Sequence, residues 1–197
     1  GEALKHLLAE SRLRPDAVVI CEPSENRICL GHKGKAQLAI TTHGVSAHGS
    51  APDKGVNAIY EMAEIIQRVE RRNLELLQAA EHPPEGEAPG GLRGTLVLSQ
   101  ISSTAASLNA VPSACRAYLD RRTVPGETDD DLRREMAELL RGKNATWEVD
   151  VIHRTSWTGL EFSYRPFHQA WRIDPDHPLT RACEAAYRDA FSVQRAP

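Results

Sequence analysis

The stretch KGKAQLAITTHG, residues 33–44, carries the first clear structural pattern in the chain. Apolar residues take every second position in its middle, and this alternation predicts a β-strand with one buried face. These alternating residues are Ala36, Leu38 and Ile40. From Val56 to about Ala79, apolar residues recur instead at helical spacing, with Arg and Glu on the opposite face. The stretch therefore predicts the start of a strand–loop–helix unit.

Four further elements follow this unit. Residues 94–104 (GTLVLSQISST) and 115–124 (CRAYLDRRTV) predict two more strands, and Thr128 is suited to cap a second helix. Apolar and polar residues alternate again at residues 147–151, which predicts a fourth strand. Between residues 33 and 154 the predicted order is β-α-β-β-α-β. That order is typical of a ferredoxin-like domain, in which both helices cover one face of a four-stranded antiparallel sheet.

The two ends of the chain differ in character from its middle. Residues 1–32 contain a predicted helix and the wholly apolar run Ala17–Cys21, which predicts a buried strand of a parallel sheet. Residues 155–197 contain one amphipathic helix, from His177 to Phe191. Neither end has enough elements to form a layer of its own. We therefore predict an α+β fold, with a domain at residues 33–154 flanked by pieces of an α/β domain.

The composition argues against several classes of partner. The net charge is −3 and no stripe of basic residues occurs, so a nucleic acid is not expected. The apolar runs are too short to cross a bilayer and the start shows no signal-peptide pattern, so no membrane is expected. The four cysteines show neither a CxxC pair nor zinc-finger spacing, and we interpret them as reduced thiols of a cytoplasmic protein.

Two residues with catalytic or metal-binding chemistry stand in loops that follow predicted strands. Glu22 comes directly after the apolar run, and ligands of α/β sheets bind at the carboxyl ends of strands. Its carboxylate could hold a metal ion, or it could cap a turn. His48 lies among small residues in GVSAHGSAP, residues 44–52. Its imidazole could donate a hydrogen bond to a substrate carbonyl, or it could be an exposed loop histidine.

Polar residues also flank the strand predicted at residues 115–124. Asn109 precedes it, and its amide could contact a substrate or could form a turn before Pro112. Arg121 and Arg122 stand at its end, and neighbouring strand residues point to opposite faces. At most one of the two can therefore face a given pocket, where a guanidinium would suit a carboxylate. The other is expected to face solvent or to be paired.

Taken together, three segments resemble metallopeptidase family M20, a family of co-catalytic zinc amidohydrolases. It includes acetylornithine deacetylase, succinyl-diaminopimelate desuccinylase and carboxypeptidase G2. The segments are CEPS (21–24), GVSAHGSAPDKGVNAI (44–59) and SLNAVPSACRAYLDRRTVPGET (107–128). The motifs DRR…GET and SWTG are most similar to a branch of selenium-metabolism-linked hydrolases. The resemblance implies that residues 33–154 are a lid and dimerisation domain inserted into a catalytic domain.

The resemblance also implies a role for each candidate residue. Glu22 corresponds to an acidic zinc ligand of the catalytic domain. His48 corresponds to a lid histidine that enters the partner subunit's active site in a homodimer and polarises the scissile carbonyl. Asn109 corresponds to a lid asparagine that contacts the substrate, also from the partner. Arg122, in D-x-R register from Asp120, corresponds to the arginine that receives the substrate carboxylate.

Several parts of the family pattern are absent from this sequence. It has no H-x-D, no adjacent Glu-Glu general base and ligand, and no late histidine ligand. The family uses two zinc ions in each active site, and one carboxylate cannot hold them. We therefore expect this chain to bind no zinc stably and to be inactive alone. The expected substrate is a small N-acyl amino acid or peptide-like amide. The alternative is a non-catalytic ferredoxin-like module that dimerises or binds a small molecule.

Overall fold

The protein is described here by a computed structural model, which places residues 8, 14–21, 23–81 and 92–191. The chain divides into two compact units. One unit comprises residues 33–171, and the other comprises residues 1–32 together with residues 172–197. The larger unit contains an antiparallel sheet and two helices, so the predicted α+β class is confirmed. Among the placed residues, no helix combines the length and the apolar character needed to cross a bilayer.

The sheet of the larger unit has four main strands in the spatial order β3-β4-β2-β5. Each strand runs antiparallel to its neighbours. The strands are β2 (Lys35–His43), β3 (Thr95–Thr104), β4 (Ala114–Arg122) and β5 (Ala145–Val149). Leu38 lies opposite Leu119 and Ile40 lies opposite Ala117. This register puts the alternating apolar residues of both strands on one face, as their period of two requires.

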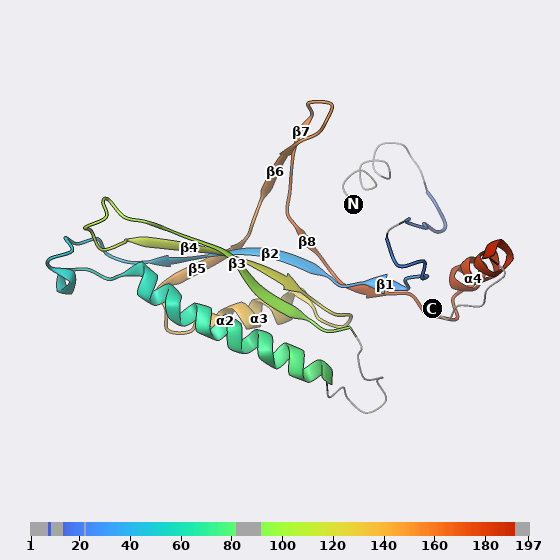
Figure 1. Ribbon diagram of the computed structural model, residues 1–197, viewed down its shortest axis with the longest axis horizontal. Helices are drawn as coiled ribbons and strands as arrows, with labels where there is room; N and C mark the ends of the chain where they lie inside the picture. Colours follow the sequence, from blue (N-terminus) through green and yellow to red (C-terminus); the bar gives the residue numbers. More distant parts are fainter. Residues whose placement is uncertain (1–7, 9–13, 22, 82–91, 192–197) are drawn as a thin grey trace. The chain divides into compact units, whose positions relative to one another are not determined.

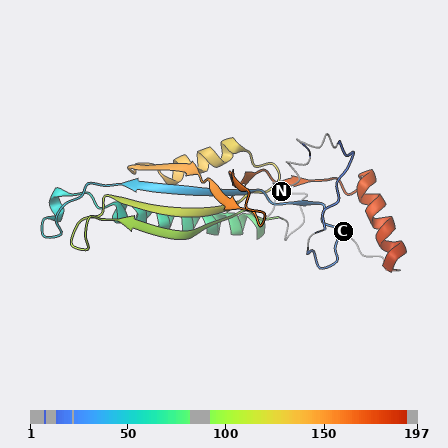
Figure 2. The ribbon, with the colours of Figure 1, turned by 90° about the horizontal axis from the view of Figure 1, so that it is seen from above.

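Two helices cover that apolar face. They are α2 (Ala58–Glu81), which follows β2, and α3 (Asp129–Leu139), which follows β4. Both lie on the same side of the sheet in Figure 1, and Figure 2 shows α2 beneath β3 and β4. Met62 of α2 and Met136 of α3 pack with Leu38, Ile40 and Leu119 in one buried cluster. Burying each such side chain stabilises the fold by about 1.5–3 kcal/mol.

The start of α3 follows the sequence prediction in detail. The Thr128 hydroxyl accepts a hydrogen bond from the backbone N–H of Asp131, and the Asp131 carboxylate accepts one from the backbone N–H of Thr128. This reciprocal pair satisfies two donors that the first turn of a helix leaves unpaired. Hydrogen bonds from the Thr128 hydroxyl and backbone hold the pKa of the Asp131 carboxyl below its ordinary value.

Short strands follow β5. Strands β6 (Ile152–Thr155) and β7 (Glu161–Tyr164) form a hairpin, and β8 (Phe167–His168) pairs with β2. The hairpin and β8 belong to the larger unit, which extends to residue 171. Strands β1 (Gly31–His32) and β9 (Trp171–Arg172) pair with each other. The predicted domain boundaries at 1–32, 33–154 and 155–197 stay a prediction.

The smaller unit departs from the sequence prediction. Its helix α4 (Pro178–Phe191) is present as predicted, but Ala17–Cys21 does not form a strand and its side chains are exposed. The prediction of a buried strand there was therefore wrong. A strand of a parallel sheet needs a neighbouring strand and a cover on both faces, and no described strand pairs with Ala17–Cys21. The predicted helix before Arg14, apart from Leu8, and the loop predicted at 81–91 lie outside the described residues, apart from Glu81.

Candidate functional site

The loop that links β2 to α2 folds back tightly on itself. The N–H groups of Val45 and Val56 each donate to the other's carbonyl oxygen at 2.9 Å. A Cβ added at Gly44 would lie 2.1 Å from the Val56 carbonyl oxygen, so no larger residue fits there. The 3-10 turn η1 (Pro52–Lys54) and Asn57 complete the loop. The Asn57 carboxamide oxygen accepts the Ile59 N–H at 2.9 Å, at the start of α2.

A second loop, which precedes β4, packs against the first. The Gly49 N–H donates to the Asn109 carbonyl oxygen at 2.6 Å, and the Val111 N–H donates to the Ala47 carbonyl oxygen at 2.8 Å. His48 and Ala110 form an isolated antiparallel bridge between the two loops. A Cβ at Gly49 would lie 2.7 Å from the Asn109 carbonyl oxygen. The fold therefore joins the backbones of the two loops that carry His48 and Asn109, although these residues are far apart in the sequence.

The side chains of His48 and Asn109 are both exposed. Each has one polar atom bound to a serine two residues away. The His48 Nδ1 atom lies 2.8 Å from the Ser50 hydroxyl and 3.2 Å from the Ser50 backbone nitrogen. The Asn109 Oδ1 atom accepts from the Ser107 hydroxyl at 2.5 Å. No described residue makes a hydrogen bond to Nε2 of His48 or to Nδ2 of Asn109, so these two atoms remain available to a ligand.

Arg122 lies at the other end of β4. Its Nε and Nη2 atoms donate to the two carboxylate oxygens of Asp120, at 2.6 and 3.2 Å. The eight steps from Ala114 to Arg122 span roughly 27 Å at about 3.4 Å per residue. Within one subunit the structure therefore does not bring Arg122 to His48 and Asn109. The side chain is half-buried and keeps free N–H groups that could receive a carboxylate.

Arg121 points to the opposite face of the sheet and is buried, as the alternation of strand residues requires. It forms ion pairs with Glu135 of α3 at 2.7 Å and with Glu127 at 2.5 Å. Burial alone would lower the pKa of Arg121, but its hydrogen bonds and charge contacts with the two glutamates outweigh burial and raise it. The arginine that does not face the candidate pocket was expected either to face solvent or to be paired. The structure shows that this arginine, Arg121, is paired.

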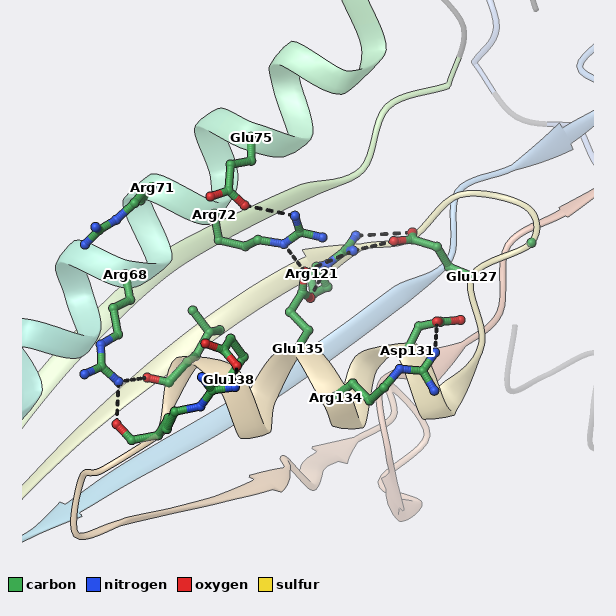
Figure 3. Close-up of a pocket in the computed structure, with 13 residues that line it drawn as sticks. Arg68, Arg71, Arg72, Glu75, Arg121, Glu127, Asp131, Arg134, Glu135 and Glu138 are labelled. Atoms are coloured by element: carbon green, nitrogen blue, oxygen red, sulfur yellow. Dashed lines mark hydrogen bonds and ion pairs between the residues drawn. The ribbon is translucent and has the colours of Figure 1, made fainter. Parts of the chain in front are cut away.

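The Arg121 cluster borders a charged cavity of about 820 Å³ between α2 and α3 (Figure 3). Arg72 of α2 donates to Glu135 at 2.7 Å and to Glu75 at 3.1 Å, so that Glu135 joins Arg72 and Arg121 (Figure 3). The carboxylates of this cavity are paired with its arginines, and the network ties β4 to both helices. We interpret it as a structural network and place the candidate site at the two loops.

The predicted metal ligand Glu22 lies outside the described residues. Among the residues that are placed, no group of three or more His, Cys, Asp or Glu side chains could hold a metal ion. The described residues by themselves therefore do not form the zinc site that the resemblance implies. All four cysteines are free thiols. Cys115 is buried as expected of a strand residue, whereas Cys21 is exposed with the rest of its segment.

Sequence reasoning found His48 and Asn109 but missed the two serines that contact them. The available signal was the spacing, since Ser50 and Ser107 each stand two residues from the side chain that they bind. A hydroxyl at that separation can reach a neighbouring side chain only when the loop bends sharply. The bend itself depends on close backbone contacts with distant parts of the chain.

These two loops, and the sheet that carries them, lie within a recognised family domain. The sequence profile of the M20 peptidase dimerisation domain matches residues 30–148, which is more than half of the chain. The chain therefore belongs to the M20 peptidase family, through its dimerisation domain.

Two relatives in particular extend this comparison. The Escherichia coli K12 protein YgeY is 32% identical over 193 residues, covering 97% of this chain and 46% of that protein. The acetylornithine deacetylase of Klebsiella pneumoniae is 30% identical over 184 residues, covering 91% of this chain and 44% of that enzyme. The chain thus spans less than half the length of these curated relatives.

Solved structures of low sequence identity share the fold. A tripeptidase from Staphylococcus aureus superposes with a TM-score of 0.56 at 14% identity, over 82% of this chain and 36% of that chain. The M20 metallo-carboxypeptidase Sso-CP2 from Sulfolobus solfataricus gives a TM-score of 0.52 at 12% identity, over 84% of this chain and 45% of that chain.

Proposed function

We propose that this chain is the lid and dimerisation portion of a zinc-dependent M20 amidohydrolase. The complete enzyme would hydrolyse an amide bond in an N-acyl amino acid or a peptide-like substrate. One observation carries the proposal. Gly44, Gly49 and Asn57 of the GVSAHGSAPDKGVNAI motif each build the loop, whereas the exposed His48 ring has Ser50 as its only hydrogen-bond partner among the described residues. A loop that holds a histidine at its surface without structural need of it is suited to present that histidine to a substrate.

His48 would act on a substrate bound by a partner subunit. Its imidazole would donate a hydrogen bond to the carbonyl oxygen as negative charge develops there, and Asn109 beside it would contact the same substrate. Arg122 of the subunit that binds the substrate would receive the substrate carboxylate. The separation of roughly 27 Å along β4 supports this division, because one lid cannot place both of its ends on one small substrate.

A homodimer would form along the edge strand β3. This strand pairs with β4 alone among the described strands, and its residues from Ser99 to Thr104 are exposed. The unpaired backbone groups of such an edge can pair with a second copy about a two-fold axis. The side chains of Ile101 on β3 and of Ile59 and Leu74 on α2 are also exposed, and they would supply apolar contacts beside that seam.

Sedimentation tests the seam. The chain should sediment as a dimer at micromolar concentration, and Ile101→Asp should shift it toward monomer by placing a charge in the apolar contact. Leu160→Asp, at an exposed apolar residue of the hairpin tip, is the matched control and should leave the dimer intact. A wild-type chain that stays monomeric, or equal effects of the two variants, would contradict the proposed seam.

Glu22 would be one zinc ligand and the other ligands would lie outside this chain, because no group of three candidate ligands occurs among the described residues. The chain alone is accordingly expected to be inactive, and turnover of N-acetyl amino acids by the purified chain with added zinc would contradict this. The alternative, a module that only dimerises or binds a small molecule, would leave the exposed His48 without a role. A cytoplasmic location stays a prediction, consistent with four free thiols.

The proposed role of His48 is tested in the complete enzyme of which this chain would be part. His48→Ala should keep its metal content and lower kcat by about 10²–10³, as loss of one oxyanion donor does. Mixing it with a variant that lacks only the catalytic base should restore part of the activity, because one site of each mixed dimer is then complete. Mixed dimers that form and remain inactive would refute a role across the subunit boundary. Loss of zinc from His48→Ala would make the residue a ligand instead.

A further inference from the structure

The surroundings of His48 determine which of its ring nitrogens carries the proton. The Ser50 backbone nitrogen lies 3.2 Å from Nδ1 and donates its N–H to it. A backbone N–H can only donate, so Nδ1 must use its lone pair as an acceptor and carries no proton. The Ser50 hydroxyl, 2.8 Å from the same Nδ1, must then donate as well. Ser50 thus aims two donors at one nitrogen.

A neutral imidazole carries one proton, so the proton of His48 belongs on Nε2. No described residue makes a hydrogen bond to this nitrogen, and it is a hydrogen-bond donor. Asn109 shows the same arrangement, because the Ser107 hydroxyl donates to Oδ1 at 2.5 Å and leaves the Nδ2 amide donors outward. The two side chains that the loops bring together therefore both present donors. A ligand of either side chain must offer acceptor atoms, as a carbonyl or carboxylate oxygen does.

We propose that Ser50 is a positioning residue, whose backbone and hydroxyl hold His48 in its Nε2–H tautomer so that the ring can donate to a substrate carbonyl oxygen. The catalytic meaning of this tautomer rests on the function proposed above, but the tautomer itself does not. A histidine in the opposite tautomer would present a lone pair to the carbonyl oxygen and would repel it. Ser50 therefore selects, without touching the substrate, the form of His48 that can stabilise an oxyanion.

The chain contains an internal comparison. The Nδ1 atom of His177 accepts the backbone N–H of Leu179 at 3.1 Å, again from two residues ahead. Position 179 has no hydroxyl, so His177 shows what the backbone donor does alone. A difference in tautomer ratio between His48 and His177 therefore measures the contribution of the Ser50 hydroxyl.

Long-range ¹H–¹⁵N correlation spectra of the histidine rings test the proposal on the chain itself. They are recorded at alkaline pH, where imidazole is neutral. Protonated and bare ring nitrogens resonate at well-separated ¹⁵N frequencies. Wild-type His48 should show a protonated Nε2 and a bare Nδ1. Ser50→Ala removes one neutral hydrogen bond and should lower the ratio of the Nε2–H to the Nδ1–H form by about two- to tenfold, leaving His48 similar to His177.

Ser50→Thr keeps the hydroxyl and should restore the wild-type pattern, while His177 should be unchanged in both variants. A wild-type His48 that is protonated on Nδ1, or a Ser50→Ala spectrum identical to wild type, would overturn the proposal. A structural role of Ser50 alone would predict changes in folding stability with no change in the tautomer ratio. Because no substrate is needed, these spectra are independent of the mixed-dimer result. The tautomer could be as proposed while His48 fails to act across the dimer. His48 could equally act across the dimer without Ser50 controlling its tautomer.

Discussion

Two apolar segments of this protein, QLAI at 37–40 and AVVIC at 17–21, differ in burial: the first is buried and the second is exposed. In the first, within β2, Leu38 and Ile40 are 0% exposed. In the second, Val19 and Ile20 are 65% and 63% exposed. Hydrophobicity does not separate the two segments, since AVVIC is the more apolar. The difference is that β2 pairs with β4 and β5 and is covered by helices, whereas no described strand pairs with AVVIC.

The comparison shows that an apolar segment is buried only when the chain supplies its neighbours. The larger unit supplies them, with strands on both sides of β2 and two helices over one face. The smaller unit has helix α4, whose side chains are also mostly exposed. This contrast supports the proposal that the smaller unit is a set of pieces of an α/β catalytic domain, which would cover these surfaces in the complete enzyme.

The largest expected difference between the two units concerns their ion pairs. Arg121, 3% exposed in its side chain, joins Glu135 and Glu127 in the larger unit, and Arg121→Met leaves Glu127 without this ion pair and the buried Glu135 with Arg72 alone. We expect it to lower the free energy of unfolding by about 3–5 kcal/mol. Arg181, 67% exposed in its side chain, pairs with Asp176 at 3.0 Å in the smaller unit, and Arg181→Met should cost about 0–1 kcal/mol. Urea unfolding measures both, and similar costs would mean that the Arg121 network is not buried as described.

An intermediate difference is expected from one substitution made in both segments. Ile40→Ala opens a cavity in a packed core and should cost about 2–5 kcal/mol. Ile20→Ala removes the same atoms from an exposed position and should change stability by no more than about 0.5 kcal/mol. The midpoints of urea unfolding, compared at equal slope, give both values. If Ile20→Ala proved as costly as Ile40→Ala, the AVVIC segment would have to be buried in solution.

The smallest difference concerns helix backbones. Ala137 of α3 and Ala185 of α4 are both exposed, and Gly at either position weakens its helix by about 0.5–1 kcal/mol. Because α3 is fixed to the core by Met136 and Leu139, Ala137→Gly should lower global stability by that amount. Ala185→Gly should reduce only the local protection of α4 in hydrogen exchange. An equal loss of global stability in both variants would show that α4 unfolds together with the sheet.

The candidate site could be predicted from the sequence only in part. His48 and Asn109 stand out by residue type and by the motifs around them, and both proved to lie in adjoining loops. The contact between these loops, through the Gly49 N–H and the Asn109 carbonyl oxygen, could not be predicted from periodicity, because it depends on how two loops meet. The role of Ser50 was missed for the same reason. Arg121 was correctly limited to one face of β4, but its glutamate partners come from α3 and the preceding turn.

The sequence by itself determined the four main strands and two helices of the larger unit, because their signals are local: a period of two for strands, helical spacing for α2 and α3, and the Thr128 cap. It did not predict the short strands β6, β7 and β8. It also determined the family, since the motif residues stand at fixed spacings along one chain. Only the tertiary structure decided which apolar segments are buried, which arginine is paired, and which atoms of His48 and Asn109 are hydrogen-bonded within their own loops. Those properties belong to contacts between residues far apart in the sequence. Burial and hydrogen bonding depend on the neighbours that a group has in space, and a local sequence pattern does not specify those neighbours.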